Sequence, residues 1–443
     1  MAIIIIKDDD LDFMFLKNVI KNRTVKNAGW LIAEKVIQMA ISLFVGLLTA
    51  RYLGPSNYGL INYAAAYTAF FSSFCTLGIN SLLVKEFVDH PEKEGEIIGT
   101  TLLLRGISSI FSAITIIGIV SIVDMGEKTT ILVVALCSLG LVFHIFDTFS
   151  FWFQRHLNSK VSAFATLIAY IIISVYKVFL VVTGKDVFYF ALSSSIDYVC
   201  IAIILFIAYR RYGGKKLSFS WEYGKSLLSR SHHFILSGLM VAIYGQTDKL
   251  MLKQLLDTSE VGYYSTAIHL CNMWCFILAA IINSMYPSIM EAHNTNEEKF
   301  EKLNRQLYAI VFYVSIFVSL CFCLFGGLAI KILYGKSFLP AVAPLKIITW
   351  YTAFSYLGAA RDAWLVCKNK QKYIVKTYFF AAIINVALNF VFIPLMGASG
   401  AALASLITQI FTGILLPLLI KELRENAILM LKAISLKDVF PKK

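Results

Sequence analysis

The stretch GQTDKLMLKQLLDTSEVGYYSTA, residues 245–267, decides the fold because it ends one long apolar segment and begins another. Asp248 and Lys249 lie inside the apolar run that precedes the sequence LDTSEVG. A similar sequence, LGPSNYG at residues 53–59, also stands between two long apolar segments. The repeated junction predicts two repeated halves that are built from apolar helices.

Composition places the chain in a membrane. Of its 443 residues, 58% are hydrophobic and only 15% are charged, and the mean hydropathy is +0.73. Soluble domains carry about 25% charged residues, so we expect an integral membrane protein in contact with membrane lipids. The formal net charge is +13, but the basic residues lie between apolar segments, so we expect no nucleic-acid partner.

No motif predicts catalysis or a bound metal. The eight cysteines lie in or beside apolar runs and form no CxxC pair, which is typical of packing residues. Nucleophile elbows and phosphate-binding glycine loops are absent from the sequence. We expect no catalytic residue, no metal and no cofactor. The apolar run of the N-terminal MAIIIIKDDD is too short for a signal peptide, so the first long apolar segment is expected to act as an uncleaved anchor.

Long apolar segments predict an all-α membrane protein with twelve transmembrane helices, because a spanning helix needs about 20 mostly apolar residues. Strand-like alternation, which would indicate a barrel, is absent from the sequence. The predicted segments are roughly 27–50, 60–84, 97–121, 129–150, 161–183, 187–208, 231–254, 261–289, 307–332, 341–367, 374–396 and 398–421.

A basic connection at residues 209–230 divides these segments into two lobes, 27–208 and 231–421. The remaining parts are an N-terminal segment, 1–26, and a C-terminal tail, 422–443. Since each lobe has an even number of predicted helices, the two lobes share one orientation and are related by an axis along the membrane normal.

Positive charge predicts the orientation, because cytoplasmic connections carry an excess of Lys and Arg. Alternate connections, beginning with the N-terminal segment and including the tail, hold nearly all Lys and Arg residues outside the apolar segments. The opposite connections hold only Arg51, Lys128, Lys185, Lys331 and Lys336. We therefore expect both termini in the cytoplasm. All outer connections are short, which argues against a membrane-bound sugar-transfer enzyme.

Ionisable residues inside the apolar segments are candidates for substrate binding, because each costs at least ~2.5 kcal/mol at bilayer depth and usually faces a cavity or a partner. The helix rise predicts that the basic ones lie at several depths across the membrane. They would then suit an anion such as phosphate. These predicted substrate-binding residues are Lys35, Arg105, Lys177, Lys249 and Arg361. Alternatively, they pair with Glu34, Asp147, Asp197 or Asp362, and Lys177 reaches the outer interface.

Asp248 predicts a candidate cation site. Asn385 and Asn389 lie one turn apart on one helix face, and Ser405 and Thr408 follow on the last predicted helix. Their oxygens suit a hard cation such as Na⁺. Alternatively, Asp248 pairs with a neighbouring base and the asparagines bond between helices.

Several stretches together resemble one transporter family. They are ARYLGPSNYGLINYAAAY (50–67), TDKLMLKQLLDTSEVGYYSTA (247–267), MYPSIM (285–290), LYGKSFLPA (333–341) and GASGAALAS (397–405). In this order they resemble polysaccharide-biosynthesis flippases of the multidrug/oligosaccharidyl-lipid/polysaccharide exporter superfamily.

The resemblance implies a MATE-like fold, in which two six-helix lobes enclose a central cavity that opens to each side in turn. It implies that an undecaprenyl-pyrophosphate-linked oligosaccharide crosses the cell (inner) membrane for O-antigen, capsule or exopolysaccharide synthesis, with polymerase machinery as a partner. In relatives, cationic cavity residues engage the pyrophosphate, a role carried by placement to Lys35, Arg105, Lys249 and Arg361.

Related lipid II flippases have a Na⁺ site in the second lobe, which Asp248, Asn385 and Asn389 resemble, so Na⁺ or H⁺ coupling is expected. The two additional helices of those flippases are missing here, which makes lipid II a less favoured substrate. The alternative function is a multidrug cation antiporter with an acidic cavity, for which Asp147 and Asp197 are candidates.

Overall fold

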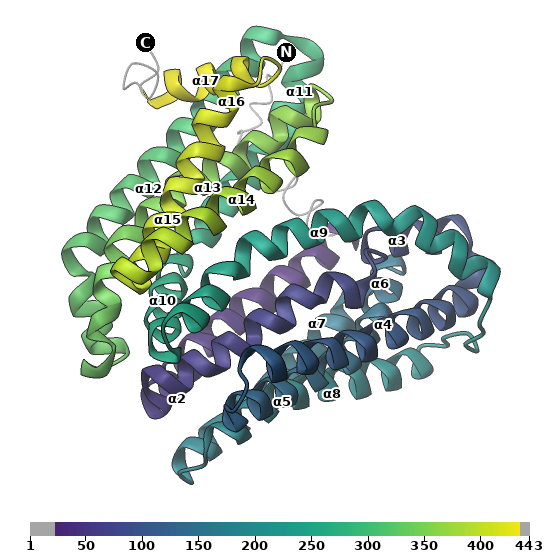
Figure 1. Cartoon of the computed structure of the whole chain (residues 1–443). Helices are drawn as coiled ribbons and strands as arrows, with labels where there is room; N and C mark the ends of the chain where they lie inside the picture. The colour runs from purple at the N-terminus through teal and green to yellow at the C-terminus, as the bar shows by residue number, and fades with distance from the viewer. Residues whose placement is uncertain (1–22, 435–443) are drawn as a thin grey trace, which may run out of the picture. The chain divides into compact units, whose positions relative to one another are not determined.

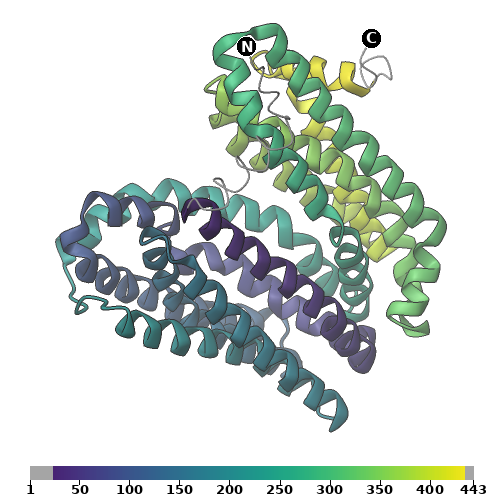
Figure 2. The ribbon, with the colours of Figure 1, turned by 180° about the vertical axis from the view of Figure 1, so that it is seen from behind.

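The computed structural model describes residues 23–434, except for the side chains of residues 23–29, 31–33, 81 and 237. All regular structure in this range is helical (Figures 1 and 2), so the predicted all-α class is confirmed. Nine helices of the same range are long and apolar enough to cross a membrane; the count of twelve stays a prediction. Most of the predicted N-terminal segment, 1–26, and the end of the predicted tail lie outside the described residues.

The chain divides into two compact units. Unit 1 comprises Met1–Thr49 and Phe71–Leu236, and unit 2 comprises Ala50–Phe70 and Ser237–Lys443. The predicted lobes differ from this division, because residues 50–70 group with unit 2 and the boundary in α9 falls after Leu236. The lobe boundaries at 209–230 therefore stay a prediction.

Unit 1 is built from the first part of α2 and the helices that follow it, and α4, α5 and α8 run side by side (Figure 1). Its core includes Phe87, Phe149 and Trp152. Its helices are α2 (Arg23–Thr76), α3 (Asn80–Asp89), η1 (Pro91–Lys93), α4 (Glu94–Val123), α5 (Lys128–His144), η2 (Ile145–Asp147), α6 (Thr148–Arg155), α7 (Ser159–Val182), α8 (Val187–Arg211) and the start of α9 (Trp221–Leu255).

Unit 2 contains residues 50–70 of α2, the rest of α9 and all later helices. In it α13 packs between α12 and α15, and α17 lies against α12 (Figure 1). Its helices are α10 (Thr258–Asn272), α11 (Cys275–Thr295), α12 (Glu297–Leu333), η3 (Lys336–Ala341), α13 (Val342–Cys367), α14 (Lys372–Met396), α15 (Ala398–Ile410), the π-helical η4 (Phe411–Leu415), α16 (Leu416–Leu419) and α17 (Arg424–Ile434).

The two repeated turn sequences pack against each other within unit 2. A Cβ on Gly59 would lie 1.7 Å from the Thr258 carbonyl oxygen, and a Cβ on Gly262 would lie 2.2 Å from the Pro55 carbonyl oxygen. Gly59 and Gly262 are the last residues of the two motifs, so each repeat uses its glycine to admit the backbone of the other. The contact is reciprocal, as an internal repeat requires.

Local backbone geometry breaks two of the predicted segments. Gly54, with φ 71° and ψ 174°, kinks α2 ahead of Pro55. The predicted segment 60–84 ends at Thr76, because Leu77 and Gly78 have positive φ and α3 begins at Asn80. The predicted segment 261–289 is interrupted between α10 and α11. Apolar composition sets the approximate position of these helices but not where the backbone turns.

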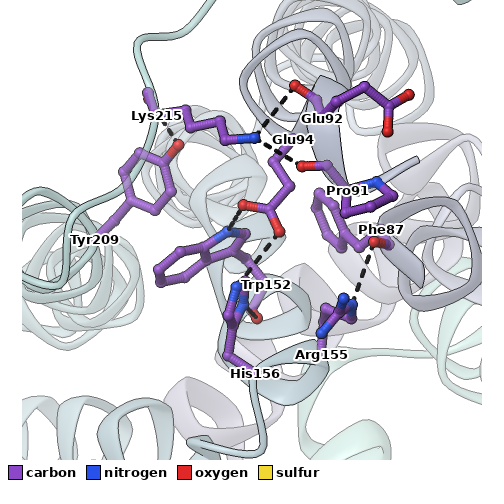
Figure 3. Close-up of polar contacts among 9 residues, drawn as sticks. All are labelled: Phe87, Pro91, Glu92, Glu94, Trp152, Arg155, His156, Tyr209 and Lys215. Carbon is purple, nitrogen blue, oxygen red and sulfur yellow. Dashed lines mark hydrogen bonds and ion pairs between the residues drawn. The ribbon is translucent and has the colours of Figure 1, made fainter. Parts of the chain in front are cut away.

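The connection between α8 and α9 is held on unit 1 by hydrogen bonds to backbone carbonyl groups. Ser218 N donates to the Gly95 carbonyl over 3.1 Å, and Lys215 Nζ donates to the Pro91 carbonyl over 2.7 Å (Figure 3). Tyr209 OH donates to the Lys215 carbonyl over 2.8 Å, and beside it Trp152 Nε1 donates to Glu94 Oε2 over 2.9 Å (Figure 3). The basic connection is therefore packed on α4.

Candidate functional site

Asp248 of α9 accepts the hydrogen bonds of a buried network in unit 2. The residue is only 6% exposed. Asn389 Nδ2 of α14 donates to Oδ1 over 2.6 Å, and Ser405 Oγ of α15 donates to Oδ2 over 2.5 Å. Tyr264 OH of α10 also donates to Oδ2. Since a buried carboxylate is costly without such donors, four helices are tied together at this acid.

The two asparagines extend the network, and one of their amide oxygens has no hydrogen-bond partner among the described residues. Asn389 Nδ2 also donates to Asn385 Oδ1 over 3.1 Å, and Asn385 Nδ2 donates to Ser405 Oγ over 3.4 Å. Asn389 Oδ1 is buried and has no hydrogen-bond partner among residues 23–434. A carbonyl oxygen without a donor beside a carboxylate fits a small hard cation, which takes carboxylate, amide and hydroxyl oxygens as ligands.

The fold thus brings together four of the five residues predicted for the cation site: Asp248, Asn385, Asn389 and Ser405. The fifth, Thr408, donates instead to the Ala404 carbonyl of its own helix over 2.7 Å. Whether any of them binds a cation stays a prediction. The sequence analysis did not include Tyr264 among the candidate site residues. The available signal was the position of Tyr264 just after the repeated turn.

Lys249, next to Asp248 in sequence, is half-buried. Its Nζ lies 3.4 Å from Gln246 Oε1, one turn back on the same helix. Consecutive residues of an α-helix point in directions about 100° apart. The side chains of Lys249 and Asp248 therefore form hydrogen bonds with different residues.

Arg361 of α13 lines a pocket of about 300 Å³ inside unit 2. The residue is 4% exposed. Its Nη1 donates to the Thr412 carbonyl over 3.3 Å, and its Nε has no partner in the described part of the chain. The other polar side chains of the pocket wall come from α9, α13, α14, α15 and η4: Tyr244, Tyr351, Ser355, Asp362, Thr377, Tyr378, Gln409 and Thr412. We call this the tyrosine pocket.

A π-helical segment forms part of the pocket wall. Thr412 and Gly413 lie in η4, where α15 changes from α to π geometry. Such single-turn bulges rearrange backbone hydrogen bonds and are frequent at functional sites. Here the Thr412 carbonyl accepts from Arg361.

Arg105 of α4 has a different environment in unit 1. It is fully buried, at 0% exposure. Its Nη1 donates to Thr148 Oγ1 over 2.8 Å, and its Nη2 lies 3.5 Å from the His144 carbonyl. Its Nε, like that of Arg361, is buried without a hydrogen-bond partner in the described part of the chain. The guanidinium is packed among α4, α5 and α6, so contact with an anion would require rearrangement.

The two remaining predicted bases also lie in unit 1. Lys35 has a 71% exposed side chain, and its Nζ contacts Glu34 Oε1 over 3.5 Å. Lys177 of α7 is half-buried and interacts electrostatically with Asp197 of α8. Both lysines therefore have the acidic neighbours that the alternative prediction named, Glu34 and Asp197, but the side chain of Lys35 is largely exposed.

The amino-acid sequence matches a known protein family over most of its length. A family model described as "Polysaccharide biosynthesis protein" matches residues 24–293, which is more than half of the chain. The chain belongs to this family. The resemblance found in the sequence is therefore confirmed.

Two relatives carry related names. The capsular polysaccharide biosynthesis protein CapF of Staphylococcus aureus is 23% identical over 400 residues, which cover 87% of this chain and 96% of that protein. A putative O-antigen transporter of Salmonella typhi is 26% identical over 131 residues, 30% of each chain.

Solved structures of transporters share the fold. An inward-facing MATE family transporter of the MOP superfamily has a TM-score of 0.65 and 14% identity, covering 91% of this chain and 99% of that one. The lipid II flippase MurJ, in an inward closed conformation, has a TM-score of 0.66 and 15% identity, covering 92% and 88%. The predicted membrane-transporter fold is confirmed, because solved transporter structures share it over about nine tenths of this chain.

Proposed function

We propose that this chain moves an undecaprenyl-pyrophosphate-linked oligosaccharide from the cytoplasmic to the outer leaflet for synthesis of a surface polysaccharide such as O-antigen, capsule or exopolysaccharide. The observation that carries the proposal is Arg361, a buried guanidinium with an unpaired Nε at the wall of a polar pocket. A buried cation with unmet hydrogen-bond capacity at membrane depth is costly and marks a substrate path. Membership of a polysaccharide-biosynthesis family supports a glycan as the cargo.

Transport would proceed by alternating access of two lobes around a central cavity, with the prenyl chain left in lipid. Lys35 and Lys249 have ammonium groups that are not held in buried ion pairs, so they are suited to the pyrophosphate. Arg105 would join them only after the packing around Thr148 opens. Arg361 would engage the polar head group from the C-terminal lobe.

We further propose that the Asp248 network couples transport to Na⁺ or H⁺. Asp248, Asn385 and Asn389 would supply oxygen ligands, and the ion would offset the buried carboxylate charge. The unpartnered Asn389 Oδ1 supports this assignment. Binding in the network would change how tightly α9, α10, α14 and α15 are joined.

Neutralising variants test the transport proposal. Purified protein is reconstituted in vesicles with a fluorescent prenyl-pyrophosphate-linked glycan, and translocation is read from quencher access. Lys35→Gln, Arg105→Gln, Lys249→Gln and Arg361→Gln are compared with the unsubstituted protein at equal reconstitution. We expect translocation to fall in each of these variants; full activity of all four would refute the proposal. Export of cationic dyes instead would indicate the alternative function, a multidrug antiporter.

The coupling proposal needs a separate measurement. Translocation is recorded with Na⁺ replaced by K⁺ at fixed membrane potential, and then across a pH gradient. A rate that changes with neither ion would remove the Asp248 network from the mechanism without affecting the choice of substrate.

We also propose that the protein lies in the inner cell membrane with both termini cytoplasmic, beside polysaccharide polymerase machinery. Lys185→Cys and Lys215→Cys, made in a background without other cysteines, test the orientation. An impermeant maleimide added outside intact cells should label only the first. Labelling of the second cysteine only would show that the orientation in the membrane is the opposite of the proposed one.

A further inference from the structure

The tyrosine pocket has a charge balance that does not suit pyrophosphate. Its lining contains one base, Arg361, and one acid, Asp362. A pyrophosphate group carries more than one negative charge and is usually bound by several cationic or N–H donors. With its net charge near zero, this pocket suits an uncharged polar ligand better than a polyanion.

Three tyrosines and one glutamine of the lining combine an apolar part with a hydroxyl or amide tip. Tyr244, Tyr351 and Tyr378 each offer a ring with a polar end, and the rings of Tyr244 and Tyr378 are 6.4 Å apart at an angle of 48°. Gln409 Nε2 donates to Tyr244 OH. A sugar ring has the complementary pattern, with C–H groups on its faces and hydroxyl groups around its edge.

The charged pair supplies both kinds of hydrogen-bonding group. Arg361 offers N–H donors only, whereas an ionised Asp362 offers acceptors only. A hydroxyl group both donates and accepts, so neighbouring sugar hydroxyls can satisfy both residues at once. Arg361 Nε, which is buried and unpartnered within residues 23–434, is a donor left available for such a ligand.

Space and access limit the size of the ligand. A volume of about 300 Å³ is at the lower end of the ~300–1,000 Å³ typical of ligand pockets, so one or two sugar rings fill it. Gly245 and Gly358 lie in the lining, and a Cβ added to either would meet no atom within 4 Å. These glycines therefore face open space in the pocket.

We propose that the tyrosine pocket binds one uncharged sugar residue of the transported glycan, with hydroxyl groups on Arg361 and Asp362 and the sugar ring against the tyrosines. The proposal rests on the proposed function and deepens it. On this proposal the glycan is recognised in unit 2, separately from the pyrophosphate. Arg361 then binds a sugar hydroxyl group instead of the pyrophosphate.

Binding is measured on the purified full-length protein by saturation-transfer NMR, with methyl glucoside, methyl glucuronide and inorganic pyrophosphate as probes. We expect methyl glucoside to bind more tightly than the two anions. Arg361→Gln and Asp362→Asn should each weaken glucoside binding about tenfold, because each removes one side of the hydroxyl recognition. Gly358→Leu should abolish it by filling the pocket. Gly118→Leu is the control, since a Cβ there also meets no atom within 4 Å but lies in α4.

The two charge variants give opposite results for the two kinds of ligand. An anion site would be weakened by Arg361→Gln but strengthened by Asp362→Asn. That pattern, or an unchanged glucoside affinity in Gly358→Leu, would overturn the proposal, as would the absence of glucoside binding. Translocation of the lipid-linked glycan is measured in parallel: active transport without glucoside binding refutes only the pocket, whereas glucoside binding without transport refutes the proposed function.

Discussion

Asp248 and Arg361 are two buried charges of the same unit, and their surroundings differ. Asp248 receives hydrogen bonds from Asn389, Ser405 and Tyr264, so three donors of the protein stabilise its buried charge. Arg361 donates to one backbone carbonyl, keeps an unpartnered Nε and faces a pocket. Equal burial therefore does not mean equal surroundings: Asp248 joins four helices through its donors, whereas Arg361 keeps an unpartnered donor at the wall of a pocket.

The largest expected effect is on stability, from Asp248→Ala. The substitution leaves three buried donors without an acceptor, each worth about 1–3 kcal/mol. We expect the free energy of unfolding to fall by about 3 kcal/mol or more, with loss of transport. Ser405→Ala, which removes one donor and keeps the acid, should cost only about 1 kcal/mol. Thermal unfolding in detergent measures both; equal small effects would show that the network does not join the helices.

The second effect concerns α10, which carries Tyr264 to Asp248. Gly59→Ala places a Cβ 1.7 Å from the Thr258 carbonyl oxygen at the start of α10, so the two repeated turns must separate. We expect a loss of about 2 kcal/mol and weaker protection of α10 in hydrogen exchange, with glucoside binding in the tyrosine pocket retained. Gly46→Ala is the matched control, because its Cβ would meet no atom within 4 Å. If hydrogen exchange in α10 is unchanged, the contact between the two turns does not support the Asp248 network.

A third, smaller change in free energy is expected from Arg361→Gln. Transport should fall about tenfold, equivalent to ~1.4 kcal/mol, whereas the unfolding temperature should change little because only one hydrogen bond to Thr412 is lost. Paired transport and thermal unfolding measurements on one preparation check this. A destabilisation as large as that of Asp248→Ala would contradict the contrast between the two charges.

The smallest expected effect on stability comes from Glu86→Gln, a substitution in unit 1 outside the predicted membrane segments. Burial raises the pKa of its carboxyl group, but hydrogen bonds from Arg230 and Tyr223 outweigh burial and leave the pKa below its usual value. Arg230 Nη1 lies 2.5 Å from Glu86 Oε1, and its side chain is 45% exposed, so solvent screens the pair. Because the folded pKa is lowered, the stabilisation is present above the unfolded pKa and is lost as pH falls through the folded value.

Glu86→Gln should therefore remove a small acid-dependent part of the stability and leave glucoside binding unchanged. Unfolding temperatures between neutral and acidic pH measure it. If the variant keeps the full acid dependence, other carboxyl groups cause it.

Part of the candidate site was predictable because it depends on spacing along one helix. Asn385 and Asn389 lie four residues apart, so one face of α14 carries both wherever the helix packs. Charge inside an apolar segment marked Asp248 and Arg361 as costly residues in need of partners. The contacts of Tyr264 and Gln409 were not predicted, because they depend on how neighbouring helices are rotated about their axes.

The sequence by itself determined the all-helical membrane class, the family and the repeated turn, because these depend on composition, on residue periodicity and on short motifs. Tertiary structure alone decided which charges are satisfied and which face space. It buried Arg105 against Thr148, turned Thr408 to its own backbone and opened a pocket beside Arg361 at the π-helical segment. The physical reason is that hydrogen-bond satisfaction is settled between helices, by packing that no single segment encodes.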